Sequence, residues 1–447
     1  MELVKIIEAN DYETYVKNKT AEIEEEMDDS AMVGRIIAKV RAEGDKAVRH
    51  YTAQFDKSVP ENFEVPMEKA REAWECLKTS DPQLASSLSL AADNIRRFSS
   101  LQKGQFRDFE EELQPGLFTG QRIIPVEKAA IYVPGGRFPL VSSALMALIP
   151  AAVAGVKEKI LVSPPREWGF PDLRIMAAAY IAGADRIFTI GGAQAIAALA
   201  LGTETIPRVD LIAGPGNKYV VMAKRMLFGE VGIDFLPGPS DVLIVAGKGE
   251  GSSDQIAKAA GLVAVDMLAQ AEHDPDARSL ALVPSREFAE AVKMALEKDL
   301  SMLPTAEIAR ASLQEGGLII VYSTKEEAVK IANRIAPEHL ELHVSAPETW
   351  VEGLRNYGSL FMGAAAAEVL GDYSAGINHT LPTLGTARFT GGLSVRNFLK
   401  AVTTLRCEPG GAYFEALSAA ETIARAEGLR AHAESAAIRL RHGVFSK

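Results

Sequence analysis

Short apolar runs alternate with Ala-rich helical patterns through the middle of this chain, and this alternation limits its possible folds more than any other feature. The first runs cover residues 129–133, 159–162 and 186–190, and helical patterns at 142–156 and Leu173–Ala182 separate them. Strands that are apolar on both faces, each followed by a helix, are typical of a parallel sheet covered by helices on both sides. The pattern therefore predicts an α/β protein.

The alternation continues with a strand at 209–213 and then with a second series of strands at 242–246, 280–283, 318–321 and 359–362. A chain of 447 residues is too long for one ordinary domain. We therefore expect two parallel-sheet Rossmann-like domains, with helical N-terminal and C-terminal segments. The expected parts are a helical segment at 1–125 that packs with the second α/β domain, a first α/β domain at 126–237, a second at 238–388, and a helical arm at 389–447.

Charge and composition exclude several classes of function. The net charge is −11 and no long basic block occurs, which argues against a nucleic-acid partner. The first residues lack the pattern of a signal peptide, and no apolar run is long enough to cross a membrane, so we expect a cytoplasmic protein. The cysteines, Cys76 and Cys407, lie far apart, which excludes a disulfide framework and a thiolate zinc site. Any metal would then have nitrogen and oxygen ligands.

Glycine-rich turns follow three of the expected strands, at 135–136, 191–192 and 214–216. Ligands of open parallel sheets bind at the carboxyl ends of the strands. Glycines there allow close approach of the backbone, and a following helix N-terminus attracts phosphate, which suits a dinucleotide. No Gly-x-Gly-x-x-Gly fingerprint lies in a turn from strand to helix, so a standard Rossmann cofactor site is not supported. Ordinary tight turns are the alternative for each glycine pair.

The stretch at 269–275 is a candidate half of a metal site. It ends an apolar run at 256–268 that is typical of a helix, and Pro275 cannot continue that helix because it lacks the N–H. Gln270 and His273 are three residues apart, so on a helix they share one face. A helix cap or a surface histidine is the alternative interpretation.

A second candidate is the dipeptide Glu338-His339, which follows Ala336-Pro337. A turn fixed by proline would present an acid and a base side by side. Such a pair can face one reaction centre, where one group takes a proton and the other orients water.

Two further histidines lie near carboxylates. Asp372 and His379 belong to a loop punctuated by glycine and proline, and Glu427 and His432 belong to the C-terminal helical segment. Residues five apart do not share a helix face well. We therefore expect a break in that helix near Gly428.

Taken together, these motifs resemble the histidinol dehydrogenase family over about residues 25–440. The matching stretches lie at 132–136, 191–197, 214–217, 238–240, 270–275, 336–341, 371–373, 378–379, and at 426–429 with His432. So many motifs in one order make a specific signal.

The resemblance implies an oxidoreductase of histidine biosynthesis. Its reaction would be the zinc-dependent, NAD-linked four-electron oxidation of L-histidinol to L-histidine through the aldehyde. It also implies a homodimer in which the C-terminal arm crosses to the other subunit. In such a dimer one zinc ligand, His432, comes from the partner.

The roles that the resemblance implies fall into four groups. Catalysis is carried by Glu338, which activates water, and by His339, the general base toward the alcohol. Zinc is held by Gln270, His273, Asp372 and His432. NAD contacts Tyr132, Gln194 and Asn217. The substrate contacts Ser240, Gln270, His273, His339, Asp372, His379, Glu427 and His432.

The chain departs from the family at Asp241, because the family usually has Glu after Gly-Pro-Ser. A paralogous dehydrogenase that acts on another small polar alcohol, such as a sulfonated propanediol, is therefore an alternative. Glu427 favours histidinol, since a carboxylate suits an amine and an anionic substrate would need Arg or Lys. From other classes, a metal-dependent hydrolase would use Glu338 and His339 without NAD. A non-catalytic binding protein would not need His339.

Overall fold

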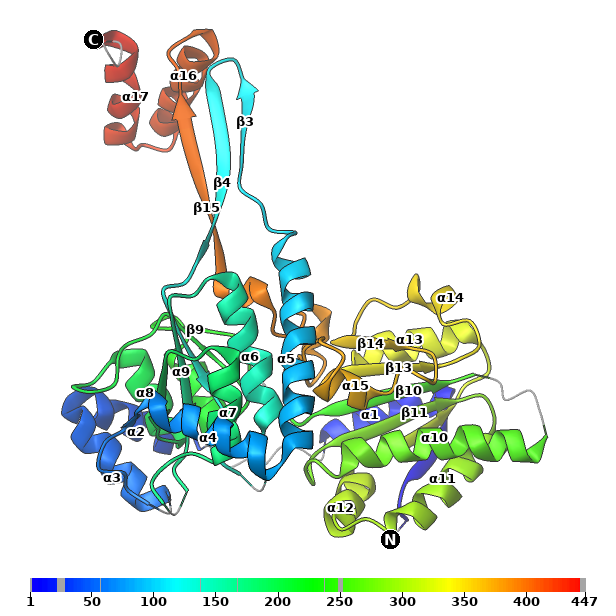
Figure 1. Ribbon diagram of the computed structural model, residues 1–447. Helices are drawn as coiled ribbons and strands as arrows, with labels where there is room; N and C mark the ends of the chain where they lie inside the picture. The colour runs from blue at the N-terminus through cyan, green and yellow to red at the C-terminus, as the bar shows by residue number, and fades with distance from the viewer. Residues whose placement is uncertain are drawn as a thin grey trace. The chain divides into compact units, whose positions relative to one another are not determined.

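The computed structural model describes residues 2–21, 29–56, 58–136, 138–166, 168–236, 238–247 and 252–442. The chain divides into two compact units (Figure 1). The first unit comprises residues up to Ser100 together with Glu127–Phe398, and the second comprises Leu101–Val126 and the chain from Leu399 on. Within the described residues, the strands form two six-stranded sheets and one three-stranded sheet. The two larger sheets both belong to the first unit.

The first six-stranded sheet has the order β2-β7-β6-β5-β8-β9, and every neighbouring pair is parallel except β2 with β7. Its strands are β2 (Glu64–Val65), β5 (Lys128–Tyr132), β6 (Glu158–Ser163), β7 (Arg186–Thr189), β8 (Leu211–Ala213) and β9 (Gly232–Ile233). The following helices are α6 (Val141–Ala154), α7 (Leu173–Ala182), α8 (Gly192–Leu201) and α9 (Lys218–Leu227). After β5 the chain adds β6 and β7 on one side of that strand and β8 and β9 on the other. The carboxyl ends of β5 and β8 therefore form a topological switch point.

The second six-stranded sheet is parallel throughout, in the order β1-β12-β11-β10-β13-β14. Its strands are β1 (Lys5–Glu8), β10 (Asp241–Ala246), β11 (Arg278–Val283), β12 (Leu318–Val321), β13 (His339–His343) and β14 (Ser359–Met362). Its helices are α1 (Tyr12–Ala21), α10 (Ser253–Ala271), α11 (Arg286–Leu300), α12 (Ala306–Gly316), α13 (Lys325–Ile335), α14 (Glu348–Val351) and α15 (Glu368–Tyr373).

Apolar side chains cover both faces of this second sheet. Val242 and Ile244 of β10 pack in one core with residues of α10 and α11, while Leu243 and Val245 pack in another with residues of α13. Alternate residues of a strand point to opposite faces, so an uninterrupted apolar strand must be covered twice. The prediction of two doubly covered parallel sheets is confirmed.

The N-terminal segment differs from our expectation. We expected residues 1–125 to pack with the second α/β domain, and among the described residues β1 and α1 pack with the second sheet. The next helices contact helices of the first sheet: α2 (Ser30–Glu43) and α3 (Asp45–Phe55) contact α8, and α4 (Met67–Ser80) contacts α7. α5 (Pro82–Lys103) follows them. Helical periodicity shows that a helix has an apolar face, but it does not show which sheet that face covers.

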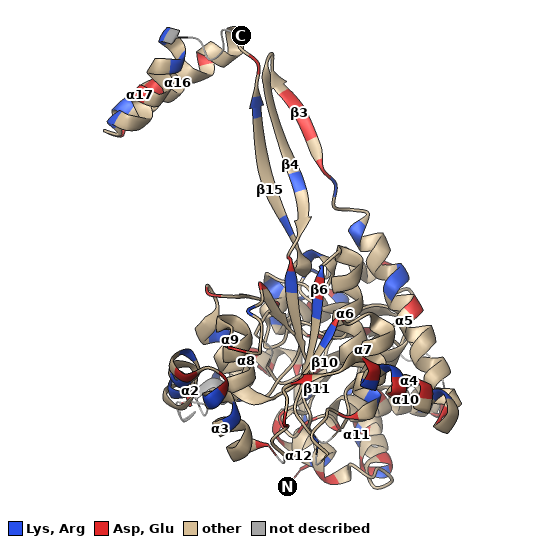
Figure 2. Ribbon diagram, turned by 60° about the vertical axis from the view of Figure 1, so that its left-hand side comes forward, with Lys and Arg blue, Asp and Glu red and all other residues tan. Residues whose placement is uncertain are grey.

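The second unit contains strands that we did not predict. An antiparallel sheet with the order β15-β4-β3 is formed by β3 (Phe109–Gln114), β4 (Leu117–Pro125) and β15 (Leu399–Cys407). Figure 2 shows acidic residues along β3. The helices α16 (Gly411–Ala426) and α17 (Arg430–His442) follow, and Gly428 between them has a φ of 77°, so the predicted helix break is confirmed. The expected helical arm, residues 389–447, therefore contains the long strand β15 before its two helices.

Two other sequence expectations concern the chain as a whole. Cys76 and Cys407 are both free and exposed. Along the described residues, no helix combines the length and the apolar character needed to cross a membrane.

Candidate active site

Glu338 and His339 enter the second sheet at the amino end of β13. Helix α13 ends at Ile335 because Ala336 takes a left-handed backbone, with a φ of 53°, and Pro337 cannot continue the helix. Both acid and base are buried. Ligand sites in open parallel sheets usually lie at the carboxyl ends of strands. This pair lies at the opposite end because the turn that presents it precedes the strand.

His339 lies between two carboxylates of α15. Its Nδ1 is 3.2 Å from Glu368 Oε1, and its Nε2 is 3.5 Å from Asp372 Oδ1. The three groups are close enough to share one metal ion. Burial alone would lower the pKa of His339, but the carboxylates of Glu368, Glu338 and Asp372 outweigh it and raise that pKa well above its ordinary value. The site therefore holds a strongly basic imidazole in an acidic cluster.

Glu338 forms a reciprocal pair with Asp241, the first residue of β10. The Glu338 N–H donates to Asp241 Oδ1 at 2.6 Å, and the Asp241 N–H donates to Glu338 Oε2 at 3.1 Å. Burial raises the pKa of Glu338 to about 8, although the charge of His339 opposes it. A carboxyl group that loses its proton near this pH is suited to take a proton from water. Ser240, a predicted substrate contact, immediately precedes Asp241.

His379 is held at both ring nitrogens. Its Nδ1 lies 2.9 Å from the backbone oxygen of Asp372, and its Nε2 lies 3.1 Å from Ser143 Oγ in α6. A carbonyl oxygen can only accept, so Nδ1 carries the proton and Nε2 accepts from the serine hydroxyl. Burial lowers the pKa of His379, which keeps the ring neutral. The loop of Asp372 and His379 is thereby fastened to a helix of the first sheet.

The residues predicted to bind zinc are placed in two units. α10 ends at Ala271, so Gln270 lies in its last turn. Glu272 keeps a helical backbone and the His273 N–H bonds the Gln270 carbonyl at 3.3 Å, so His273 lies one turn beyond Gln270. The amide of Gln270 is 1% exposed, and neither of its polar atoms has a hydrogen-bond partner among the described residues. Asp372 Oδ1 is likewise buried and lies 3.5 Å from His339 Nε2. Burial would raise the pKa of Asp372, but His339 lowers it, and His273, which is exposed, adds to this lowering.

Nitrogen and oxygen donors of this kind suit zinc. Buried polar atoms usually have partners, and the buried amide of Gln270 offers an oxygen atom that could bind a metal ion. The donors present therefore fit a metal ion. His432 lies on α17 and Glu427 at the end of α16, both exposed and both in the second unit.

The predicted NAD contacts lie at the carboxyl edge of the first sheet. Tyr132 ends β5, is buried, and accepts the Gly192 N–H at its hydroxyl at 3.1 Å. Gln194 is 1% exposed, and within the described ranges neither of its amide atoms has a partner. Asn217 caps α9, since its Oδ1 accepts the backbone N–H groups of the second and third residues that follow it. Tyr132 ends β5 and Asn217 follows β8, the two strands of the switch point, whereas Gln194 lies in the first turn of α8, after β7.

Sequence reasoning missed several buried acids and a second cluster. Glu368 and Asp241 were not predicted, because only folding brings them beside His339 and Glu338. Glu341 and His343, on the same face of β13 as His339, approach each other at 3.1 Å (Oε2 to Nε2), and Asp266 of α10 lies 3.6 Å from the same nitrogen. The polar alternation from His339 to His343 could have signalled a strand with one charged face.

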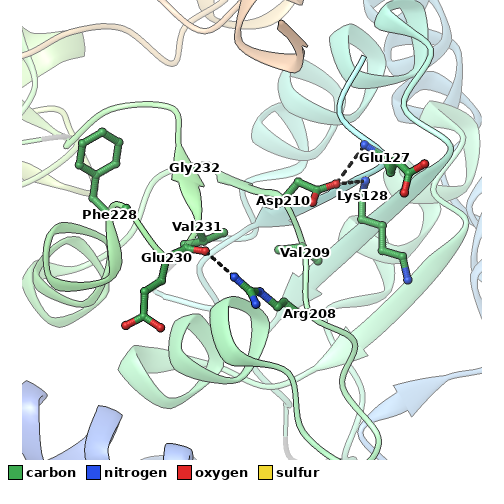
Figure 3. Close-up of a pocket in the computed structure, with 10 residues that line it drawn as sticks. Glu127, Lys128, Arg208, Val209, Asp210, Phe228, Glu230, Val231 and Gly232 are labelled. Atoms are coloured by element: carbon green, nitrogen blue, oxygen red, sulfur yellow. Dashed lines mark hydrogen bonds between the residues drawn. The ribbon is translucent and has the colours of Figure 1, made fainter. Parts of the chain in front are cut away.

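A separate depression of about 510 Å³ lies at the amino ends of the first sheet (Figure 3). It contains none of the predicted site residues. Its charged groups are already engaged: Asp210 accepts the N–H groups of Glu127 and Lys128, and Arg208 donates to the Glu230 carbonyl. Its features do not point to catalysis.

Comparison with known proteins gives one consistent result. The family model of histidinol dehydrogenase matches residues 18–440. Histidinol dehydrogenases from Methylococcus capsulatus and Thermus thermophilus are 44% and 45% identical, over 94% and 91% of this chain and 93% and 94% of their own length. The crystal structure of histidinol dehydrogenase from Elizabethkingia anophelis superposes with a TM-score of 0.86, at 34% identity and 94% coverage of both chains.

Proposed function

Because this chain belongs to the histidinol dehydrogenase family, we propose that it oxidises L-histidinol to L-histidine in two NAD-linked steps with zinc bound at the site. The observation that carries this proposal is the buried cluster of Glu338, His339 and Asp372. Gln270 is also fully buried, and its amide has no partner in the described chain. One group can serve as base to the alcohol, another as base to water, and two more as metal ligands.

The metal would be held by Gln270, His273 and Asp372, and by His432 of the partner subunit. Zinc at this position would hold the substrate's nitrogen atoms and orient the alcohol carbon toward the cofactor. The family resemblance supports this set, and the buried amide of Gln270, which has no partner in the described chain, fits it.

In the first oxidation, His339 would take the proton of the alcohol oxygen while a hydride leaves the carbon for NAD. A bound metal cation would offset the carboxylates that raise the pKa of His339 and so leave its ring free to accept that proton. Water then adds to the aldehyde carbon as Glu338 takes one of its protons. The hydrated carbon would then give its second hydride to another NAD, and the acid would be released. Keeping both oxidations in one buried site prevents the loss of a reactive aldehyde. The raised pKa of Glu338, about 8, matches the role of a base that works near neutral pH.

The proposal includes a homodimer and a cytoplasmic location. Glu427 and His432 lie outside the unit that holds the other site residues, which supports a site completed by the arm of a second subunit. Glu427 would face the substrate's amine, and His379 and Ser240 would line the same pocket.

The test is NAD reduction by the purified protein with L-histidinol, compared with a sulfonated propanediol. We expect turnover with L-histidinol and at least a hundred-fold loss with His339→Asn, the scale of general base catalysis. Turnover of the sulfonated alcohol alone would sink the proposal. If the protein catalysed a hydrolysis and reduced no NAD, it would instead be a metal-dependent hydrolase.

A further inference from the structure

A second cluster of ionisable side chains lies at the carboxyl end of β13, and the proposed function does not use it. It consists of Asp266 of α10 with Glu341 and His343 of β13. One ligand atom of each residue lies within 4.8 Å of the other two. His343 follows His339 by four residues, which is about 13 Å at the usual rise of a strand. The cluster is therefore separate from the candidate active site.

The three ligand atoms lie around one point. His343 Nε2 is 3.1 Å from Glu341 Oε2 and 3.6 Å from Asp266 Oδ2. Ligands held about 2.1 Å from a zinc ion at tetrahedral angles lie about 3.4 Å apart, so these separations fit one metal ion. The other oxygen of Glu341 accepts the Glu368 N–H at 2.6 Å, which fixes the carboxylate with Oε2 toward the histidine.

Two buried atoms of the cluster have no hydrogen bond. The side chain of Glu341 is 0% exposed and that of His343 is 6% exposed. Within the described chain neither Glu341 Oε2 nor His343 Nε2 has a hydrogen-bond partner, although the two atoms lie 3.1 Å apart. A ring N–H that donated to this oxygen would have to point at it. Two buried atoms that approach each other without such a bond are arranged as ligands that face one ion.

The charge of the cluster also favours a cation. Asp266 and Glu341 together carry up to two negative charges, and among the described residues no lysine or arginine pairs with either carboxylate. Burial and the charge of Glu341 raise the pKa of Asp266 to about 7, against the opposing charge of His343. Near neutral pH a proton therefore compensates part of the negative charge, and a divalent cation would compensate all of it.

We propose that Asp266, Glu341 and His343 bind a divalent transition-metal cation, with zinc as the first candidate, at a second site of this protein. One imidazole and two carboxylates form a nitrogen and oxygen donor set that zinc accepts. Three protein ligands leave one position of a tetrahedral zinc ion for water. Binding of the ion would displace the proton that Asp266 holds near neutral pH, so the site should fill more readily as pH rises.

Such an ion would join the elements that carry two ligands of the first site. Asp266 lies four residues before Gln270 on α10, so the two residues share a helix face. Glu341 holds the backbone of Glu368 at the start of α15, the helix that carries Asp372. The second ion would therefore fix α10 and α15 to β13 and position Gln270 and Asp372 without touching the substrate. This positioning role rests on the proposed function, whereas the binding of the ion does not.

The test is the number of zinc ions that each subunit of the full-length protein retains. The protein is stripped with a chelator, incubated with excess zinc, desalted and assayed for metal. We expect two ions in the parent and in His50→Leu, which removes an exposed histidine of α3. His343→Leu should retain one ion, and Asp266→Asn should weaken the same ion while keeping the shape of the side chain.

Zinc titration gives the size of the effect. The affinity of the second ion should fall about a hundred-fold or more in His343→Leu, since even a residue outside the ligand shell contributes about ten- to a hundred-fold. The positioning role predicts that the remaining ion also binds less tightly in His343→Leu than in His50→Leu. Equal affinity of that ion in the two variants would overturn the positioning role.

An anomalous difference map from crystals of the parent grown with zinc needs no variant, so it serves even if a substitution prevents folding. We expect a peak between Asp266, Glu341 and His343. The inference is overturned if no peak lies there, if the parent retains only one ion, or if His343→Leu retains two. If the peak is present and L-histidinol is not oxidised, the proposed function fails and this inference stands. Oxidation of L-histidinol by a protein that binds a single ion would have the reverse meaning.

Discussion

A buried ion pair holds the loop that we expect to contact NAD, and its loss has a calculable cost. Lys224 of α9 and Asp234 are 0% and 1% exposed at their side chains. Lys224 Nζ donates to Asp234 Oδ1 and, at 3.1 Å, to the Gly214 carbonyl, while Asp234 Oδ2 accepts the Gly214 N–H at 2.8 Å. Both backbone groups of Gly214, three residues before Asn217, are thereby fixed.

Lys224→Met would leave the Asp234 carboxylate buried without its cation. Breaking a buried pair by removing one partner costs about 3–5 kcal/mol, because an uncompensated charge remains. Lys224→Met/Asp234→Asn should recover most of this loss, since the amide oxygen can still accept the Gly214 N–H. The matched control is Lys157→Met, whose pair with Glu127 at 3.4 Å is 78% and 70% exposed and should contribute less than about 1 kcal/mol.

The assay is denaturant unfolding followed by circular dichroism, together with NAD binding. If the pair fixes the loop, Lys224→Met should also lower the affinity for NAD, because a displaced loop loses its alignment with the cofactor. The argument from burial would be refuted if Lys224→Met lowered the free energy of unfolding by less than about 1 kcal/mol, or if the double variant were as unstable as the single one. Unchanged NAD affinity in a destabilised Lys224→Met would refute the link from the pair to the cofactor.

Three other predictions concern pH and metal. The pKa of about 8 at Glu338 predicts that oxidation of the aldehyde accelerates as pH rises through 8, and Glu338→Gln should abolish this rise in stopped-flow traces of the second NADH while the first is still formed. Burial raises the pKa of Asp56 from 3.8 to about 6, so the folded protein favours the protonated carboxyl and loses stability as pH rises between these values. In thermal unfolding, the free energy of unfolding of Asp56→Asn should therefore be about 1–2 kcal/mol higher than that of the parent at pH 7, after allowance for solvent screening. Below about pH 4 the two proteins should be equally stable. A strong chelator should abolish calorimetric binding of L-histidinol and lower the melting temperature, and added zinc should restore both. If metal analysis shows that the protein has lost its metal and L-histidinol still binds as before, the proposed ligand set is contradicted.

Much of the α/β architecture could be predicted from the sequence, because its strands are covered on both faces. The apolar runs at 242–246 and 318–321 correspond to β10 and β12 within one residue. Such runs cannot be stable in water, so burial and strand structure follow together.

The strands of the second unit gave no comparable signal. The residues of β3 are exposed on both sides, and β15 is exposed over most of its length. Polar strands of this kind are specified by pairing with a neighbour, here β4 in an antiparallel register, rather than by an apolar face. The same reasoning explains why β13 was missed, since its histidines and Glu341 interrupt the apolar pattern.

The candidate site was only partly predictable for a different reason. Glu338 and His339 are adjacent in the chain, so their proximity was visible. Asp241 and Glu368 meet them only through the strand order β10-β13-β14 and the return of α15 along β13. Asp266 gave no signal at all, because only folding brings α10 beside His343.

The most direct test of the account is the number of NADH molecules formed for each L-histidinol consumed, measured with limiting substrate and excess NAD. The account predicts two NADH per substrate, with L-histidine as the product and no free aldehyde. One NADH per substrate with release of the aldehyde, or no NADH at all, would contradict it.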